Sequence, residues 1–331
     1  MSLMSLEMER DETVELPEPD RVDWAARTRA LLDHWHGVAR DSAFGPEFAG
    51  VVPALARARA LAGPAWMETV LPMLRAHPLQ ALVRNCPIVD HSVRKPRGYA
   101  GDAALLDLIY QHPSAPLRPG NELGQRLTLH IASGAASRSV RYRRLLLAEA
   151  IDDAALRHDG ARVMSLACGH MREVEWSLAL AHGGVRELLA ADQDAESLAR
   201  VAADYGARFP MVRPTALSVK QVIRGAVPGE GGFDLVYAAG LYDYLPAAVA
   251  RALTKRLFGL LRPGGRLLLG NFGDDFDGIA FTESLMHWPL LWRTPVQIEA
   301  FANDIPAGAM ATRRVFADPT HTCWYLDLTR A

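Results

Sequence analysis

Apolar side chains recur at three- and four-residue steps through the first half of the chain, beginning near Arg21. Trp24, Leu31, Leu32 and Trp35 form the first such stripe. Similar stripes cover 52–61, 66–76, 103–110 and 137–156. This spacing is typical of amphipathic helices. Because no strand-like alternation precedes residue 160, we expect an all-helical N-terminal cap.

After residue 160 the pattern changes to short apolar runs, which predict strands at 162–167, 186–191, 211–216, 233–239 and 265–271. Predicted helices separate them, near 172–182, 195–207, 219–224 and 246–261. Strands that alternate with helices form a parallel sheet covered on both faces. Two further runs, at 311–316 and 321–328, flank Asp318-Pro319 and predict a closing antiparallel hairpin. The expected fold class is therefore α/β, with a doubly wound, mostly parallel seven-stranded sheet and a C-terminal antiparallel hairpin, preceded by the helical cap.

These patterns divide the chain into three predicted regions. Residues 1–20 are expected to be a tag and flexible tail, because Met1-Ser2-Leu3 is repeated as Met4-Ser5-Leu6 and an acidic stretch follows. Residues 21–135 form the helical N-terminal cap domain. Residues 136–331 form a Rossmann-like domain that carries the sheet.

Composition narrows the classes of partner. Half of the residues are hydrophobic, 22% are charged and the formal net charge is −2, which argues against nucleic acid as a partner. No apolar run approaches the ~20 residues that a membrane span needs. Cys86, Cys168 and Cys323 are far apart and indicate buried thiols in a reducing cytoplasm. The 11 histidines are scattered without zinc spacing, so we expect no metal site. The expected partner is a small-molecule substrate, and the sequence is compatible with a homodimer.

The segment from Arg162 to Trp176 carries the most informative functional pattern. Its apolar strand residues lead through Cys168 and Gly169 into a predicted helix that opens near Arg172. A strand, a tight turn and a helix N-terminus together present backbone N–H groups to a ligand. Only Gly169 remains of the glycine triplet of dinucleotide sites. The turn therefore suits a small nucleoside ligand with a carboxylate better than it suits a pyrophosphate.

The ends of the next two predicted strands supply further candidate ligand contacts. Asp192 ends the second strand, where an acid can accept hydrogen bonds from both ribose hydroxyls, and Gln193 lies beside it. Alternatively, Asp192 and Asp194 only cap the following helix, a role that fits Asp194 better. Leu217 and Ser218 follow the third strand, at the position that flanks an adenine ring.

The fourth predicted strand ends in the small residues Ala239 and Gly240, which let a ligand approach the backbone closely. Tyr242, Asp243 and Tyr244 follow them. Two tyrosines and an acid on the ligand side of the sheet indicate a site more than a packing cluster.

The segment Arg94–Asp102 stands apart within the cap, because it combines three cations, Pro96, two glycines and Tyr99 in nine residues. A turn between two helices, with Asp102 capping the second, is the alternative. Capping does not explain Tyr99 between two glycines. We therefore favour a lid that closes on the substrate or the cofactor.

Taken together, these residues resemble the class I S-adenosylmethionine-dependent methyltransferases. Residues 160–331 cover the expected core, and the sequence LRPGG at 261–265, before the fifth strand, is a further hallmark. Three departures occur: Ser165 stands in place of an acid, and Ala167 and Met171 stand in place of the first and third glycines. The resemblance implies S-adenosyl-L-methionine as the cofactor. The implied cofactor-binding residues are Ala167, Cys168, Gly169, His170, Asp192, Gln193, Leu217, Ser218, Ala239 and Gly240.

More narrowly, 95–102, 166–173, 238–245 and Asn271-Phe272 look like the bacterial subgroup assigned to 3-hydroxypalmitic acid methyl ester biosynthesis. In that subgroup the segment that matches 288–293 is also aromatic and basic, which implies a substrate wall. The implied substrate-binding residues are Tyr244, Trp288, Trp292 and Arg293.

The expected reaction is methyl transfer by in-line displacement, in which positioning of the acceptor near ~3 Å from the methyl carbon does much of the work. A carboxylate acceptor is already ionised at about pH 7 and needs only a clamp of cations and hydroxyls. A hydroxyl or amine acceptor would need a base such as Asp243 or a histidine. Because the sequence shows no obvious His–acid pair, we favour a small carboxylic acid and formation of its methyl ester. The expected catalytic residues are Arg97, Tyr99, Tyr242 and Asp243.

Two alternatives stay open at this point. In one, the lid seals the cofactor in and its own amino group attacks to form a cyclic product. In the other, the chain binds S-adenosylmethionine without turnover, which the incomplete glycine turn would allow.

Overall fold

The computed structural model describes residues 22–115, 122–229 and 231–331. The predicted tag and tail at residues 1–20 lie outside the described residues. Within the described ranges, seven strands form one sheet in the order β3-β2-β1-β4-β5-β7-β6. The predicted α/β fold with a seven-stranded sheet is therefore confirmed for this part of the chain.

The sheet is mixed: the neighbouring strands from β3 to β5 run parallel, whereas β7 pairs antiparallel with both β5 and β6. β4 is buried at every position, because helices cover a central parallel strand on both faces. The sequence of such a strand is a nearly unbroken run of apolar residues. The positions of these strands could be predicted from such runs. The bounds are β1 Ala161–Leu166, β2 Val185–Asp192, β3 Val212–Ala216, β4 Phe233–Ala238, β5 Leu261–Phe272, β6 Met310–Ala317 and β7 Cys323–Arg330.

Within the described residues, only helices and turns precede β1. α1 begins after Asp23, whose carboxylate accepts the N–H of Ala26, and it buries a stripe that includes Leu32 and Trp35. The helices are α1 Trp24–Asp41, α2 Val51–Ala62, α3 Leu71–Ala76, α4 Leu79–Val83, α5 Pro87–Arg94, α6 Ala103–Tyr110, α7 Glu122–Ser133 and α8 Ala135–Arg157. Later in the chain come α9 Leu178–Ala181, α10 Ala195–Tyr205, α11 Val219–Ile223, α12 Ala247–Gly259, α13 Ile279–Ser284 and α14 Pro295–Glu299.

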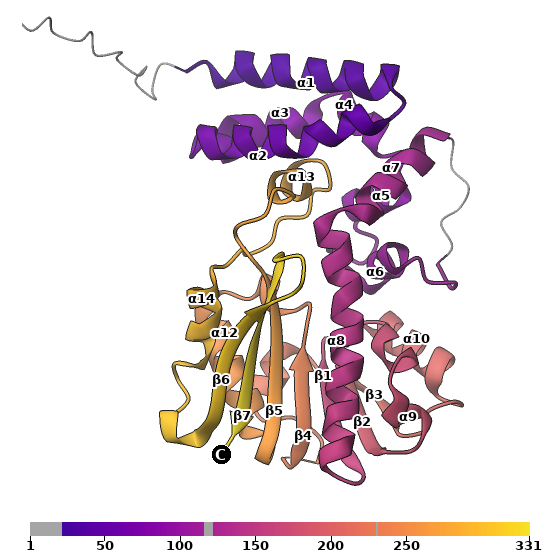
Figure 1. The fold of residues 1–331 in the computed structure, drawn as a ribbon, viewed down its shortest axis with the longest axis vertical. Coiled ribbons are helices and arrows are strands. Elements are labelled where there is room, and N and C mark those ends of the chain that lie inside the picture. Colours follow the sequence, from indigo (N-terminus) through magenta and orange to yellow (C-terminus); the bar gives the residue numbers. More distant parts are fainter. Residues whose placement is uncertain (1–21, 116–121, 230) are drawn as a thin grey trace, which may run out of the picture.

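The N-terminal helices lie beyond one end of the sheet, and α8 runs from this helical layer down along the strands (Figure 1). α8 contacts β1 and β4. α13, which follows β5, returns to the helical layer and packs against α2 and α3. The first helices therefore share their core with a segment from the C-terminal half, which includes Phe281 and Leu285. The predicted domain boundary at residues 135 and 136 stays a prediction.

The helix predicted at 172–182 is wrong in its first half. Residues Arg172–Glu175 form a 3-10 turn, and α9 begins only after Ser177, whose hydroxyl accepts the N–H of Leu180 at 3.2 Å. Arg172 and Glu173 are buried with partners on other elements. These tertiary contacts override the local helical pattern.

In the ranges described above, no helix combines the length and the apolar character that a membrane crossing requires.

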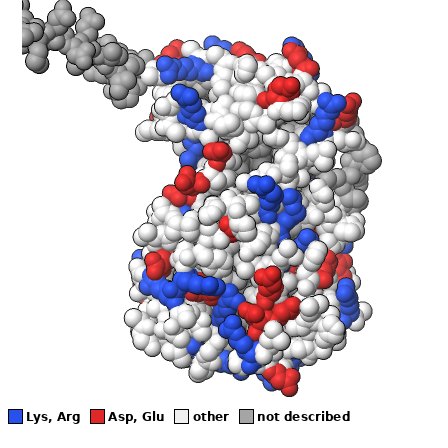
Figure 2. All heavy atoms as spheres, viewed as in Figure 1, with Lys and Arg blue, Asp and Glu red and all other residues white. Residues whose placement is uncertain are grey.

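Cys86, Cys168 and Cys323 are buried and free. Basic and acidic side chains are interspersed over the face shown in Figure 2. The cytoplasmic location and the homodimer stay predictions.

Candidate functional site

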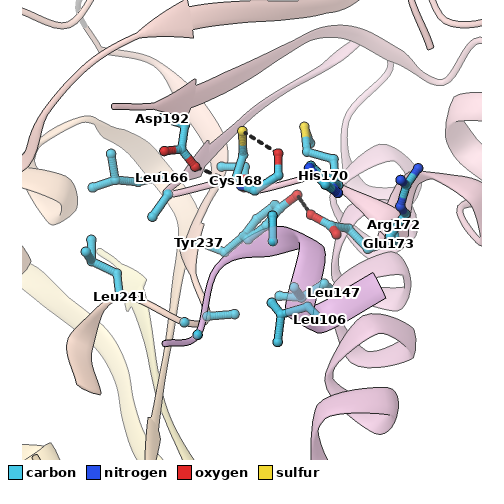
Figure 3. A pocket seen from close by; sticks show the side chains of 18 of the residues that line it. Leu106, Leu147, Leu166, Cys168, His170, Arg172, Glu173, Asp192, Tyr237 and Leu241 are labelled. Atoms are coloured by element: carbon cyan, nitrogen blue, oxygen red, sulfur yellow. Dashed lines mark hydrogen bonds between the residues drawn. The ribbon is translucent and has the colours of Figure 1, made fainter. Parts of the chain in front are cut away.

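The strand order reverses between β1 and β4, because the chain builds β2 and β3 on one side of β1 and β4 and β5 on the other. In open α/β sheets, ligands bind at the carboxyl ends of the strands at such a switch point. A cavity of about 490 Å³, here called the first cavity, lies there and is lined from β1, β2, β4, α6 and α8 (Figure 3). Its size is in the range of small-molecule sites.

Three residues of the loop that follows β1 have positive φ angles, although only one of them is a glycine. Ala167, Gly169 and Met171 have φ angles of +55°, +54° and +51°. The left-handed region costs a residue with a Cβ about 1–2 kcal/mol, so such strain persists only where the surroundings hold it. A Cβ on Gly169 would lie 3.2 Å from the Cβ of Ala103 in α6, so this position also lets the cap approach closely. Ala167 and Met171 therefore adopt a backbone conformation that usually favours glycine.

Asp192 and Asp194 have separate roles. The buried carboxylate of Asp192 lines the first cavity and accepts the N–H groups of Gly169 at 2.8 Å and Asp194 at 2.9 Å. A carboxylate offers about four lone-pair positions, so acceptor capacity is left for a ligand. Asp194 is the N-cap of α10 and accepts the N–H of Glu196 at 3.0 Å. The capping role expected for Asp194 is confirmed.

Most of the other predicted cofactor contacts also line the first cavity. They are Ala167, Cys168, Gly169, His170, Gln193, Leu217, Ala239 and Gly240. Burial, with Asp192 nearby, raises the pKa of the Cys168 thiol well above its ordinary value. This thiol therefore stays neutral and does not serve as a nucleophile.

Arg143 in α8 is a lining residue that the sequence analysis missed. Its Nη1 donates to the carbonyl oxygen of Ala239 at 2.6 Å, at the end of β4. Burial opposes its charge, but Tyr110 and Tyr325 with further groups outweigh this effect and raise the pKa of Arg143. One sequence feature could have indicated Arg143: it lies three residues after Val140, on the same buried face of α8, where a cation is unusual. A guanidinium that stays charged in a cavity suits a carboxylate.

The sequence analysis also missed a hydrogen-bonded pair that lines the first cavity, Tyr237 and Glu173. The hydroxyl of Tyr237 in β4 donates to Oε1 of Glu173 at 2.8 Å (Figure 3). Burial raises the pKa of both groups. With Arg143, these side chains give the first cavity a polar floor on the β4 side.

A buried charge network fixes the loop to α6. Asp107 accepts from Arg172 through Nε at 2.8 Å and Nη2 at 2.7 Å, and from Nδ1 of His170 at 2.8 Å. Burial opposes the ionisation of Asp107, but Arg172 and His170 outweigh it and hold its pKa well below the ordinary value. Arg172 also donates to Asp204 at 2.6 Å. The network therefore joins α6, the loop and α10.

The expectation that the chain lacks a His–acid pair is wrong, because Asp107 and His170 form one across 63 residues of sequence. The other ring nitrogen of His170, Nε2, is buried and has no hydrogen-bond partner among the described residues. The pair therefore holds His170 against α6, and His170 also lines the first cavity.

The segment 94–102 lies against the first cavity. Tyr99 and Gly101 line it, whereas Arg97 bonds to Asp194 and to Oγ of Ser197 and so ties the segment to α10. Desolvation, with Asp192 and Asp194 nearby, raises the pKa of Tyr99 to about 12. Its hydroxyl therefore stays protonated at neutral pH. Arg97 does not line the first cavity, so the structure gives no support to its predicted catalytic role.

The alternative role considered for Asp102, as a helix cap, is confirmed. Its carboxylate accepts the N–H of Leu105 at 2.8 Å at the start of α6 and also bonds to Nε2 of His91 at 2.8 Å. Capping and the lid are therefore compatible, because Asp102 fixes one end of the segment that carries Tyr99.

Tyr244 and Trp288 form a wall between two cavities. The indole N–H of Trp288 donates to the hydroxyl of Tyr244 at 2.8 Å. Tyr244 lines the first cavity, and Trp288 lines a second cavity of about 520 Å³, which Trp292 also lines. A Cβ on Gly101 would lie 2.3 Å from Trp288, so only glycine permits this close packing. The predicted substrate residues are thus divided between two spaces.

Tyr242 and Asp243 do not line either cavity. The hydroxyl of Tyr242 bonds to Oγ1 of Thr254 at 2.9 Å in the core. Oδ1 of Asp243 accepts the N–H of Phe272 at 2.7 Å, and burial raises the pKa of Asp243 to about 6. Both side chains are committed to structural contacts, so the structure gives no support to their predicted catalytic roles.

Arg293 and Ser218 also have structural partners. Nη1 of Arg293 donates to the carbonyl oxygen of Tyr242 at 2.7 Å and to Oδ1 of Asn271 at 2.6 Å. Ser218 is the N-cap of α11 in a capping box with Gln221. Arg293 is therefore no free clamp for a substrate, and Ser218 does not line the first cavity.

No protein-family model matches the chain, and no curated protein sequence matches it. A crystal structure described as that of a possible exported protein from Bordetella parapertussis has a similar fold, with a TM-score of 0.59 at 18% identity over 96% of this chain and 99% of that chain. Magnesium protoporphyrin IX methyltransferase from Synechocystis PCC 6803 with bound SAH has a TM-score of 0.44 at 15% identity over 59% and 87%. The N-methyltransferase NodS from Bradyrhizobium japonicum WM9 has a TM-score of 0.41 at 16% identity over 57% and 95%. At these identities the likeness to the Bordetella protein shows the fold alone.

Proposed function

We propose that this protein is an S-adenosylmethionine-dependent methyltransferase that acts on a small molecule. The observation that carries the proposal is the first cavity at the switch point, with the carboxylate of Asp192 on one side of β1 and the guanidinium of Arg143 on the other. A ligand that has a sugar diol and an amino-acid carboxylate matches this pair of groups.

The lining residues fit the cofactor. Asp192 would accept hydrogen bonds from the ribose hydroxyls, and Leu217 would pack against the adenine ring. Arg143 would hold the carboxylate of the amino-acid arm, which is the role that a charged guanidinium performs best. When bound, the cofactor would supply a methyl group on a sulfonium. The chain itself would orient the acceptor and keep water out.

We propose a carboxylic acid as the acceptor. Tyr244 receives the indole N–H of Trp288, which leaves its own proton free to donate. Desolvation by burial raises the pKa of both Tyr244 and Tyr99. Both hydroxyls therefore stay protonated at neutral pH. Two protonated hydroxyls beside the cavity would donate to a carboxylate, but neither would take a proton from an alcohol. Tyr244 thus replaces Tyr242 as the expected clamp.

Calorimetric titration with S-adenosylhomocysteine tests the cofactor site. We expect Asp192→Ala to weaken binding by about 1–3 kcal/mol, because the ribose hydroxyls lose their buried acceptor. Asp194→Ala is the matched control: it removes a helix cap and should lower stability by about 1 kcal/mol with a smaller effect on affinity. Equal affinity of Asp192→Ala and the wild type would overturn the proposed site.

A product assay tests the reaction and the acceptor. The protein is incubated with S-adenosylmethionine and a panel of carboxylic acids, each paired with its amide and its alcohol. Release of S-adenosylhomocysteine with the acids alone supports the proposal, and release with the alcohols alone overturns the choice of acceptor. Methylthioadenosine as the product would indicate cyclisation of the cofactor. Binding with no turnover of any kind would indicate a binding protein.

A further inference from the structure

Residues of the N-terminal helices and of the segment 272–292 line the second cavity. This segment carries α13 from the sheet back to the helical layer (Figure 1). Aliphatic side chains line it on the helical side, among them Val52, Ile131 and Val140. Aromatic side chains line it on the other side: Phe272, Phe276, Phe281, Trp288 and Trp292. Its volume of about 520 Å³ and its apolar walls are typical of small-molecule sites.

The second cavity is lined by two carboxylates and by His130, whose pKa is lowered by burial. The described residues that line it include no Lys or Arg, whereas Asp275 and Asp277 line it and are exposed. The carboxylates therefore lie at its mouth, and the apolar groups lie inside. An uncharged apolar body would gain burial here, but an anionic group would meet like charge and lose its hydration.

Buried polar contacts hold the aromatic wall in place. The indole N–H of Trp292 donates to Oε1 of Glu283 at 2.7 Å. Oε2 of Glu283 accepts from Nε of Arg59 at 2.9 Å and from the indole N–H of Trp66 at 2.8 Å. Trp288 is held separately by Tyr244. The part of the wall that Glu283 holds, which includes Trp292, is therefore preformed for a ligand.

The two cavities adjoin at the wall formed by Tyr244 and Trp288. One hydrogen bond of 2.8 Å joins the side chain that lines the first cavity to the side chain that lines the second. A movement of the Trp288 side chain would connect the two spaces. A single molecule could then reach from one to the other.

We propose that the second cavity binds the uncharged apolar body of the methyl acceptor, whose reacting group lies in the first cavity beside Tyr99 and Tyr244. This inference rests on the proposed function. It assigns the acceptor to the class of molecules with one polar reacting group and an apolar ring or chain. Trp288 is the specificity-determining residue, since its position sets the passage between the two spaces.

The test uses N-phenyl-1-naphthylamine, an uncharged aromatic probe that fluoresces when it enters an apolar site. We expect the full chain to bind the probe and Ala136→Phe to weaken binding roughly tenfold or more, because Ala136 lines the second cavity and the larger side chain fills it. Ala248→Phe, at an exposed position on α12, is the matched control and should bind like the wild type. Far-UV circular dichroism and thermal unfolding, measured on the same samples, show that each variant is folded.

Three further outcomes decide the inference. Saturation with S-adenosylhomocysteine should leave the probe bound, and displacement of the probe would place it in the first cavity and overturn the proposal. The anionic analogue 8-anilinonaphthalene-1-sulfonate should bind more weakly than the uncharged probe, and the double variant Asp275→Asn/Asp277→Asn should reduce the difference. Equal probe binding by Ala136→Phe and the wild type would overturn it as well. A wild-type protein that binds the probe but not S-adenosylhomocysteine would count against the proposed function and not against this cavity.

Discussion

The two cavities meet at one wall and are built in different ways. The first cavity takes its lining from the ends of three parallel strands and from buried acidic and basic side chains that include Asp192 and Arg143. The second cavity takes its lining from helices of the N-terminal layer and from aromatic side chains after β5. The two cavities are therefore suited to different ligands. The first cavity suits a polar cofactor, and the second cavity suits the apolar body of an acceptor.

The largest predicted effect concerns the charge network beside the first cavity. We expect Asp107→Ala to lower the free energy of unfolding by about 3–5 kcal/mol, because it leaves the buried Arg172 without its bidentate partner. Asp90→Ala is the matched control. Asp90 pairs with Arg84 and Arg94 near the surface, where ion pairs contribute about 0–1 kcal/mol. Guanidinium unfolding followed by tryptophan fluorescence measures both variants, and equal losses would remove the distinction between this network and the surface.

The next effect depends on pH and concerns Asp243, a buried residue that directly precedes Tyr244 in the chain. Its pKa of about 6 in the folded protein exceeds the ordinary value of 3.8, because burial penalises the charged form. The protonated carboxyl of Asp243 therefore contributes fully to the free energy of unfolding below about pH 4. This contribution is lost as the pH rises through about 6. The loss is on the order of 2–3 kcal/mol. Asp243→Asn should lack this loss, so its unfolding free energy relative to the wild type should rise between pH 4 and pH 7. Parallel curves for the two proteins would contradict the prediction.

A smaller effect tests which component Tyr99 contacts. We expect Tyr99→Phe to lower the turnover of the best acceptor in the panel roughly tenfold, since one hydrogen bond to the acceptor is lost. S-adenosylhomocysteine affinity should change far less. Because the pKa of Tyr99 is about 12, the ratio of the two turnover rates should be constant from pH 6 to pH 9. Equal losses of turnover and affinity would place Tyr99 on the cofactor side.

The smallest effect concerns the loop of the first cavity. Ala167→Gly should shift the unfolding free energy by less than about 1 kcal/mol, because relief of the left-handed strain offsets the added freedom of the unfolded chain. Ala167→Val places a β-branched side chain at the same φ and should destabilise the protein by more than Ala167→Gly does. Both variants should bind S-adenosylhomocysteine if they fold. Loss of binding in Ala167→Gly would show that the methyl group of Ala167, and not the loop shape, makes the site.

The sheet and part of the first cavity could be predicted from the sequence for a physical reason. Strands such as β4 are covered on both faces, so their apolar runs and the residues just beyond them stand out in the chain. Asp192 and Gly169 could be found in this way. Arg143 and Asp107 could not, because their partners are distant in sequence: Arg143 bonds to a residue 96 positions away and Asp107 to one 65 positions away. The pattern at Arg172–Glu175 misled for the same reason. Tyr242, Asp243 and Arg293 have chemistry suited to a site, but their side chains bond to residues of α12 and β5 instead.

The contacts of Glu283 bear on how this protein can be divided in the laboratory. A fragment that starts at residue 136 would keep α13 but would lack Arg59 and Trp66, two side chains that meet the Glu283 carboxylate. It would also uncover the apolar side chains by which α13 packs on α2 and α3. Such a fragment would carry a carboxylate without its partners and an exposed apolar surface that favours aggregation. We therefore expect truncation at residue 136 to give an unstable protein.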